Sequence, residues 1–276
     1  MTLFRTARLA FFILVVALMI GPLYVLLVNA FKSQTEILTS PLSLPGDGVT
    51  LEYLWAAATS SSFNVIAAYG FTAFLVVAVN VVSVLVCGPA AYVVARWSGR
   101  RHKLTLFILV AGLFIPGQVL VIPVIYVLRT VGLMGTIPGL ILFQVALTIP
   151  LSLFLFTAYI RSIPRELDEA AVIDGAGPFR TFWKVIFPLM KPAVATAVIL
   201  HTIAIWSDYV NPQIILGTGS GLYTVTTGVY AAISKYSTDY TLVYPNLLLA
   251  ILPIIVFFLV LQKQIVGGLT AGATKG

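Results

Sequence analysis

Six apolar runs, separated by polar segments, make up most of this chain. Each run is long enough to cross the hydrocarbon core of a bilayer, which takes about 20 apolar residues at the rise of an α-helix. Helices are expected, because backbone groups that face lipid must be satisfied within their own segment, and a β-barrel would show short alternating segments instead. The predicted spans are residues 9–31, 68–95, 104–128, 137–160, 192–216 and 244–262.

The composition fits the same class. Of the 276 residues, 60% are hydrophobic and 9% are charged, whereas soluble domains carry about 25% charged residues. The expected fold class is all-α and polytopic, with six transmembrane helices in one membrane domain over residues 1–276. Arg5 and Arg8 precede the first run as in a signal peptide, but the run is too long and lacks a small-x-small cleavage site, so we expect a retained span.

The basic residues predict the orientation of the spans. Lys and Arg are held back on the cytoplasmic side during insertion. With the amino terminus inside, only Lys32, Arg129 and Lys235 of the 16 basic residues fall outside. Both termini are therefore expected to be cytoplasmic, the carboxyl end as a tail over residues 263–276. This topology and anionic lipid explain the formal net charge of +7 without nucleic acid.

The sequence shows no constellation of catalytic or metal-binding residues. Cys87 is the single cysteine, which rules out an intramolecular disulfide, and no zinc or haem spacing occurs. The phosphate-binding pattern Gly-x-x-x-x-Gly-Lys-Ser/Thr is also missing, so the chain is not expected to hydrolyse ATP by that mechanism. We therefore expect neither an enzyme nor a cofactor or metal site in this chain.

One long polar segment, residues 161–191, separates the fourth span from the fifth on the basic side. Pro164 suits the first position of a helix, and the acidic residues that follow place negative charge near the positive helix end. A helix of about three turns is expected, with one narrow face at spacings of three and four residues. This face consists of Leu167, Ala170, Ala171 and Asp174.

Gly175 is predicted to end this helix in the left-handed conformation that a residue with a Cβ adopts only at a cost. A second, amphipathic helix would start at Pro178. Its apolar stripe, expected to face the membrane domain, comprises Phe179, Phe182, Trp183 and Ile186. Two helices joined by a bend form a stiff elbow suited to transmitting force. From the physics alone, a plain amphipathic connector between two spans is an equal alternative.

Glu169-Ala170-Ala171, followed by Gly175 and then Pro188, resembles the EAA signature of the inner-membrane permeases of bacterial ABC importers. Residues 115–123 and 262–276 are similar to the third span and the carboxyl tail of the carbohydrate-importer branch of that family. Trp206-Ser207-Asp208-Tyr209 stands where that branch often has Trp-Asn-Glu-Phe. The resemblance covers the chain from about residue 68 to its end.

The resemblance implies a non-catalytic permease subunit of a maltose-type importer in the bacterial inner membrane. It implies a second, non-identical permease, two ATPase subunits that bind the ATP and magnesium, and an extracytoplasmic solute-binding protein or lipoprotein. The first elbow helix would be a coupling helix that docks on the ATPase. The coupling residues implied are Glu169, Ala170, Ala171, Asp174, Gly175 and Pro188.

Asp208 is the only acidic residue within the predicted spans, and a charged residue inside a span usually faces a cavity or a partner. Around it, aromatic faces and amide groups would suit a neutral polyhydroxylated solute. The candidate residues of the solute path are Trp206, Asp208, Tyr209, Asn211 and, in the third span, Gln118. For Asp208 and Asn211, interhelical packing is an equally open interpretation.

Asn80 and Gln144 are polar positions in other spans, for which interhelical packing is favoured. A sugar or related polyol is the expected solute. Another polar solute, such as a glycerol phosphodiester or glycerol-3-phosphate, is the alternative substrate. A secondary carrier is the alternative class, although such carriers often show repeated halves and titratable residues in their spans.

Overall fold

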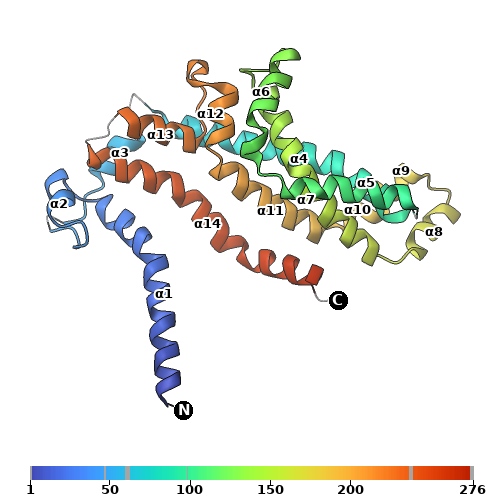
Figure 1. Ribbon diagram of the computed structural model, residues 1–276, viewed down its shortest axis with the longest axis horizontal. Coiled ribbons are helices and arrows are strands. Elements are labelled where there is room, and N and C mark those ends of the chain that lie inside the picture. The colour runs from blue at the N-terminus through green and yellow to red at the C-terminus, as the bar shows by residue number, and fades with distance from the viewer. Residues whose placement is uncertain (1, 47, 60–62, 98, 236–238, 274–276) are drawn as a thin grey trace. The chain divides into compact units, whose positions relative to one another are not determined.

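The computed structural model describes residues 2–46, 48–59, 63–97, 99–235 and 239–273, and over these residues it contains helices and turns but no strand (Figure 1). The predicted all-α polytopic class is confirmed for this part of the chain. Four helices are long and apolar enough to cross a membrane, or up to six spans form if each of two bent helix pairs counts as one. The four are α1 (Thr2–Asn29), α4 (Val65–Arg96), α7 (Ile137–Ser162) and α14 (Tyr240–Ala273).

The chain forms two compact units, residues 1–69 with 225–255 and residues 70–224 with 256–276. The first unit contains α1, α2 (Gln34–Thr39), α3 (Glu52–Ala58), α13 (Val225–Lys235) and the first part of α14. In this unit α2 begins with a capping box between Ser33 and Glu36. The buried Lys32 Nζ donates to the Ser40 carbonyl at 2.8 Å, so the segment after α1 is held compactly.

The second unit is built around α7, which lies beside α5 (Arg100–Ala111) and α11 (Lys191–Ser207) (Figure 1). Gly139 in the first turn of α7 permits a close backbone approach, because a Cβ there would lie 2.2 Å from the Leu133 carbonyl oxygen. One apolar core of this unit joins the C-terminal halves of α4 and α7 to the segment after residue 178. Its largest buried members include Leu153, Phe156, Ile160, Phe182 and Ile186.

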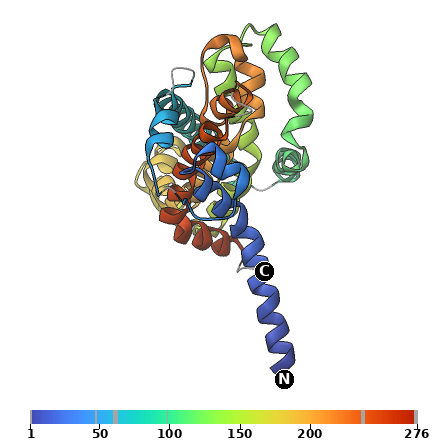
Figure 2. The same ribbon diagram turned by 90° about the vertical axis from the view of Figure 1, so that its left-hand side faces the viewer.

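The expected third span, 104–128, is not one straight helix. Its two limbs, Leu104–Phe114 and Gly117–Thr130, meet at 98°. The second limb consists of η2 (Gly117–Leu120) and α6 (Val121–Thr130). In Figure 2 α5 is seen nearly end-on, whereas α6, in light green, extends upward in the plane of the view. The bend falls at Ile115 and Pro116, because proline lacks the N–H of a helical residue and pushes the residue before it to an extended conformation.

The expected fifth span, 192–216, is also divided. The helix α11 ends at Ser207, Asp208 is extended with ψ 115°, and α12 (Val210–Leu216) follows. Aspartate favours such positions because its side chain can accept a backbone N–H at the start of the next helix. At the other end of the chain α14 stays helical through Ala273, so most of the expected tail continues the last helix, and residues 274–276 lie outside the described part.

Candidate functional site at the polar elbow

The polar segment after α7 forms two short helical pieces joined by a glycine. The first is α8 (Glu166–Ile173). The second combines α9 (Pro178–Thr181), the π-helical stretch η3 (Phe182–Ile186) and α10 (Phe187–Leu189), and it meets α11 at 74°. We call residues 163–189 the elbow.

The helix α8 has eight residues, about two turns rather than the three expected. Pro164 lies before it and does not occupy its first position. The preceding Ile163 is extended, with ψ 128°, as is common for a residue before proline. The helix is initiated instead at Arg165, whose carbonyl accepts the N–H of Asp168 at 2.9 Å.

Gly175 ends α8 as predicted, with φ +76°. The Ala176 N–H donates to the Ala171 carbonyl at 2.9 Å, and the Gly175 N–H donates to the Val172 carbonyl at 3.0 Å. These bonds satisfy carbonyls that the end of a helix would leave without partners. The left-handed glycine therefore turns the chain sharply from α8 toward α9.

The faces of the two pieces differ in part from the expected ones. Of the predicted narrow face of α8 only Ala171 is buried, whereas the other three residues are exposed. Two neighbouring apolar residues, Val172 and Ile173, point outward, and the side chain of Ile173 is 86% exposed. The elbow thus presents apolar side chains to the outside at its bend.

The predicted stripe of the second piece is correct for Phe182 and Ile186, which are buried in the core, and Trp183 is partly buried. Phe179 is different, since it is 76% exposed. Its ring packs edge-on against Trp183, with centroids 6.2 Å apart, at the outer end of the core. The first turn of α9 therefore projects beyond the apolar core instead of facing it.

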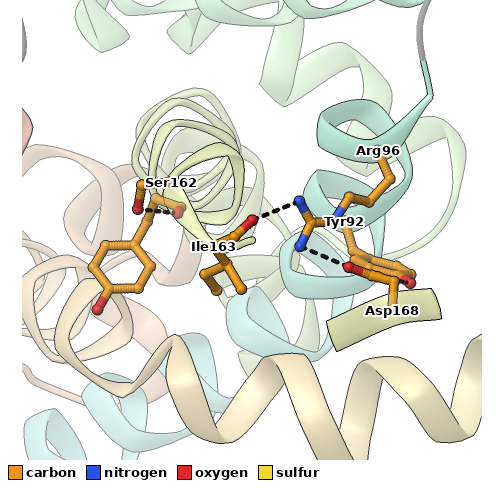
Figure 3. Close-up of polar contacts among 6 residues, drawn as sticks. Tyr92, Arg96, Ser162, Ile163 and Asp168 are labelled. Carbon is orange, nitrogen blue, oxygen red and sulfur yellow. Dashed lines mark hydrogen bonds and ion pairs between the residues drawn. The ribbon is translucent and has the colours of Figure 1, made fainter. Parts of the chain in front are cut away.

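Three side chains fasten α8 to the end of α4 (Figure 3). The Arg96 Nη2 lies 2.8 Å from Asp168 Oδ2, and the Arg96 Nη1 donates to the Ile163 carbonyl at 2.9 Å. The Tyr92 hydroxyl donates to Asp168 Oδ1 at 2.5 Å. We call Tyr92, Arg96 and Asp168 the latch. It connects a long membrane helix to the elbow through two charges and one hydroxyl.

The latch was not predicted from the sequence. Arg96 was counted only among the residues that set the orientation, and Tyr92 was not singled out. Asp168 belongs to the acidic first turn of α8, but nothing in its local pattern names a partner on a distant helix. One sequence signal could have suggested the pair. Arg96 ends one predicted span, and Asp168 lies in a polar loop predicted to be on the same side of the membrane.

A pocket of about 420 Å³ lies beside the latch, between α4, α8 and α9. Its lining is mostly apolar, and the latch supplies most of its polar groups. The lining residues are Pro89, Tyr92, Val93, Arg96, Trp97, Asp168, Val172, Pro178, Phe179, Thr181 and Phe182. Side chains therefore do not completely fill the space between these elements beside the latch.

The residues predicted for the solute path fall at two places in the second unit. Asp208 and Asn211 lie together at the break between α11 and α12, and the Asn211 Nδ2 donates to Asp208 Oδ2 at 2.8 Å. Trp206 and Tyr209 flank Asp208 and are partly buried. Gln118 is exposed on η2, in the second limb of the broken third span.

A buried polar seam runs along one face of α7, where Gln144, Thr148 and Ser152 follow one another at four-residue spacing. Gln144 donates to Asp208 at 2.6 Å, Thr148 pairs with Ser83 of α4 at 2.5 Å, and Ser152 lies 3.4 Å from the His201 Nε2 of α11. Each such bond between membrane helices contributes about 0.6–2 kcal/mol. The seam therefore holds α4 and α11 on α7.

Asn80 of α4 completes the seam. Its Oδ1 lies 3.3 Å from the His201 Nδ1, and its Nδ2 donates to Thr202 at 3.4 Å. Asn80 and Gln144 thus serve interhelical packing, as favoured from the sequence. Apart from Asp208 and the single imidazole, the seam is made of hydroxyl and amide groups.

Comparison with known proteins places these features in a family. Residues 87–266, which include the latch, the elbow and Asp208, match the family described as the binding-protein-dependent transport system inner membrane component. The diacetylchitobiose uptake system permease protein NgcG of Streptomyces coelicolor is 32% identical over 269 residues, 96% of this chain and 87% of that protein. The multiple sugar-binding transport system permease protein MsmG of Streptococcus mutans is 32% identical over 262 residues, 94% of this chain and 92% of that protein.

The fold is also known from a solved structure. A chain in the crystal structure of a bacterial ABC transporter involved in the import of the acidic polysaccharide alginate superposes with a TM-score of 0.75. The two chains are 21% identical, and the match covers 95% of this chain and 96% of that one. On the sequence match and the shared fold, the chain belongs to the inner membrane components of binding-protein-dependent transport systems, which are multi-pass proteins of the inner membrane.

Proposed function

We propose that this chain is one permease subunit of an ATP-driven importer of a sugar and forms half of its translocation path. The proposal rests mainly on the relatives of this chain, which agree in the class of solute that their names give. The two proteins that are 32% identical over more than nine-tenths of the chain are a diacetylchitobiose permease and a multiple-sugar permease. A di- or oligosaccharide is therefore the solute class favoured.

The charges of the spans support an uncharged solute. None of the six predicted spans contains Lys or Arg, and binding a phosphate inside a membrane domain calls for such groups or for helix N-termini. The one acidic residue of these spans, Asp208, accepts hydrogen bonds from the protein itself. Glycerol-3-phosphate is accordingly disfavoured as the solute of this subunit.

The elbow would couple the permease to an ATPase. Its exposed apolar residues Val172, Ile173 and Phe179 can enter a cleft of a partner, and burial of such side chains drives association between proteins. Movement of the partner would pass from α8 through the latch to α4, and rigid-body rotation of the spans would then open the solute path alternately to each side. The coupling residues Glu169, Ala170, Asp174 and Gly175 are exposed on the same elbow.

The partners follow from this mechanism. Two ATPase subunits would bind ATP and magnesium and supply the energy, since this chain contains no phosphate-binding loop of the Gly-x-x-x-x-Gly-Lys-Ser/Thr type. A second, non-identical permease would complete the path, and an extracytoplasmic binding protein would deliver the sugar. A secondary carrier would need neither the ATPase nor the binding protein.

The test is uptake by cells that contain or lack this chain. We would supply radiolabelled N,N′-diacetylchitobiose, maltose, trehalose and melibiose, with glycerol-3-phosphate as the phosphate control. We expect uptake of at least one sugar that depends on the chain and is lost when the partner ATPase is deleted. Uptake that persists without the ATPase and stops on collapse of the ion gradient would establish a secondary carrier.

A further inference from the structure

One carboxylate holds the break in the fifth span. Asp208 Oδ1 accepts the Asn211 N–H at 3.2 Å, while Oδ2 accepts the Asn211 Nδ2 at 2.8 Å and the Gln144 Nε2 at 2.6 Å. A carboxylate offers about four lone-pair sites, so donors of the protein itself occupy most of its capacity. Sugar hydroxyls would have to displace these donors in order to bind Asp208.

Gln144 lies on the stretch of α7 where the other broken span also packs. A Cβ on Gly112 would lie 3.0 Å from Pro150, and one on Gly117 would lie 3.7 Å from Leu147. These two glycines flank the bend of the third span. Positions 144 and 150 are six positions apart in the sequence, about 9 Å along a helix. The two interrupted spans thus rest on the same short stretch of α7.

Non-helical backbone at membrane depth is tolerated where protein buries it or where it lines an aqueous cavity, and broken spans mark the substrate region in many transporters. Gln144 is 5% exposed, whereas Asp208 and Asn211 are partly exposed. Gln144 is therefore a buried attachment point on α7, and Asp208 and Asn211 lie at the interruption of the fifth span, where they are partly exposed. This is the arrangement expected where a wall of a path must keep a fixed shape.

We propose that Gln144, Asp208 and Asn211, here called the node, fix the interrupted fifth span on α7 and thereby set the wall of the solute path. Asp208 is then a positioning residue and not a ligand of the sugar. The inference rests on the proposed transport function and deepens it. It replaces the direct solute contact predicted for Asp208 with an indirect role through Gln144.

Exchanging the Gln144 amide and the Asp208 carboxylate distinguishes a positioning role of Asp208 from direct binding of the sugar. Gln144→Glu places two carboxylates in contact, and only one of a close pair ionises readily. The variant should form the node when the two groups share a proton and lose it as the pH rises. Gln144→Glu with Asp208→Asn restores one carboxylate and one amide at the same contact. With the Asn211 amide turned so that its oxygen accepts from the new amide at position 208, the double variant should recover the node at all pH values. Asp208→Asn alone can re-form the contact by turning the Gln144 amide.

The variants would be studied in the full complex with its partner permease, ATPases and binding protein, in proteoliposomes. Uptake of radiolabelled N,N′-diacetylchitobiose would be measured from pH 5.5 to pH 8, together with its KM. The thermal unfolding midpoint of the same complexes would be measured over the same range without sugar. His201 is the other titratable group of the seam and is present in every variant, so its titration cancels in the comparison.

For Gln144→Glu we expect uptake relative to wild type to fall about tenfold between the lowest and the highest pH. The unfolding midpoint should fall in parallel, and both should recover in the double variant.

A raised KM in Asp208→Asn that remains raised when Gln144→Glu is added would overturn the positioning role, because a sugar ligand lost at Asp208 is not replaced at position 144. A Gln144→Glu variant without pH dependence would also overturn it. Failure of the wild-type complex to import any sugar would contradict the proposed function, whereas the unfolding midpoints would still report on the node.

Discussion

Arg96 at the end of α4 and Asp168 in α8 form an ion pair of 2.8 Å, which ties a membrane-spanning helix to the exposed elbow. The two side chains are only 12% and 18% exposed. At this burial the pair differs from a surface salt bridge, because removal of one partner leaves the other charge poorly solvated. The ion pair therefore fastens α8 to α4 and, under the proposed coupling, would carry a force on α8 to α4.

Breaking the latch should uncouple the elbow from the spans. Arg96→Met keeps the apolar stem of the side chain but leaves Asp168 without its cation, which should destabilise the attachment of α8 by about 3 kcal/mol. We expect uptake to fall at least tenfold while basal ATP hydrolysis by the assembled complex persists. Uptake and ATP hydrolysis in proteoliposomes measure both effects.

Glu166→Gln is the matched control for that experiment, because Glu166 is an acidic, exposed residue of the same helix that lies outside the latch. It should leave both activities near those of wild type. If Arg96→Met and Glu166→Gln behave alike, the ion pair does not transmit force.

Gly175 should tolerate no side chain without cost. Its φ of +76° lies in the left-handed region, where a residue with a Cβ is less stable by about 1–2 kcal/mol. Gly175→Ala should therefore destabilise the bend by roughly this amount and Gly175→Val by more, with a matching loss of coupled ATP hydrolysis. No atom lies within 4 Å of the position of the added Cβ, so the cost would come from the backbone alone.

Gly177→Ala provides the control two residues further on. Gly177 has φ −71°, and a Cβ there meets nothing within 4 Å. Its substitution should leave the stability within about 0.5 kcal/mol of wild type. Equal effects at both glycines would mean that the left-handed bend is not required.

The exposed apolar tip of α8 should be needed for binding the ATPase and not for folding. Ile173 is 86% exposed, so Ile173→Asp should change the unfolding midpoint little. In the interface with the ATPase, however, the new carboxylate would be a buried charge, which should weaken ATPase binding by about tenfold or more. Glu169→Lys on the same helix is expected to act in the same direction. Co-purification of the ATPase with each tagged variant, at equal amounts in the membrane, measures the effect. Full recovery of the ATPase with both variants would argue that another surface docks it.

Gly139 should be required for the start of α7. An added Cβ would lie 2.2 Å from the Leu133 carbonyl oxygen, a backbone atom that cannot turn aside. Gly139→Ala is therefore expected to destabilise the protein by about 1–3 kcal/mol. Gly70→Ala is the control, since a Cβ at Gly70 meets nothing within 4 Å. Thermal unfolding of the two variants should differ clearly, and equal midpoints would contradict the close approach.

The sequence predicted those features that depend on local pattern. The apolar runs identified the long helices, and Gly175 was expected to adopt its left-handed conformation because a helix with an acidic start had to end there. Pro116 accounts for the bend that the structure shows in the third span. The residue alone did not predict this bend, because many membrane helices contain prolines without breaking.

The features that the sequence did not reveal depend on contacts between distant segments. Residues 192–216 form a largely apolar run whose few polar residues near Asp208 do not by themselves predict a break, and the break there is stabilised by Gln144 on another helix. The latch likewise joins Tyr92 and Arg96 to an aspartate in a different segment. Such pairs leave no mark on hydrophobic periodicity, which reports only which face of an element is buried.

The most direct test of coupling through the elbow is the ratio of sugar molecules imported to ATP molecules hydrolysed, measured in proteoliposomes for the wild-type complex and for the complex with Arg96→Met. For wild type we predict a reproducible ratio at saturating sugar. With the latch broken, hydrolysis should continue at its basal rate while import falls, so the ratio should drop about tenfold, in line with the loss of an interaction of at least 1.4 kcal/mol. An unchanged ratio in the variant would contradict the claim that the elbow drives the spans through Arg96 and Asp168.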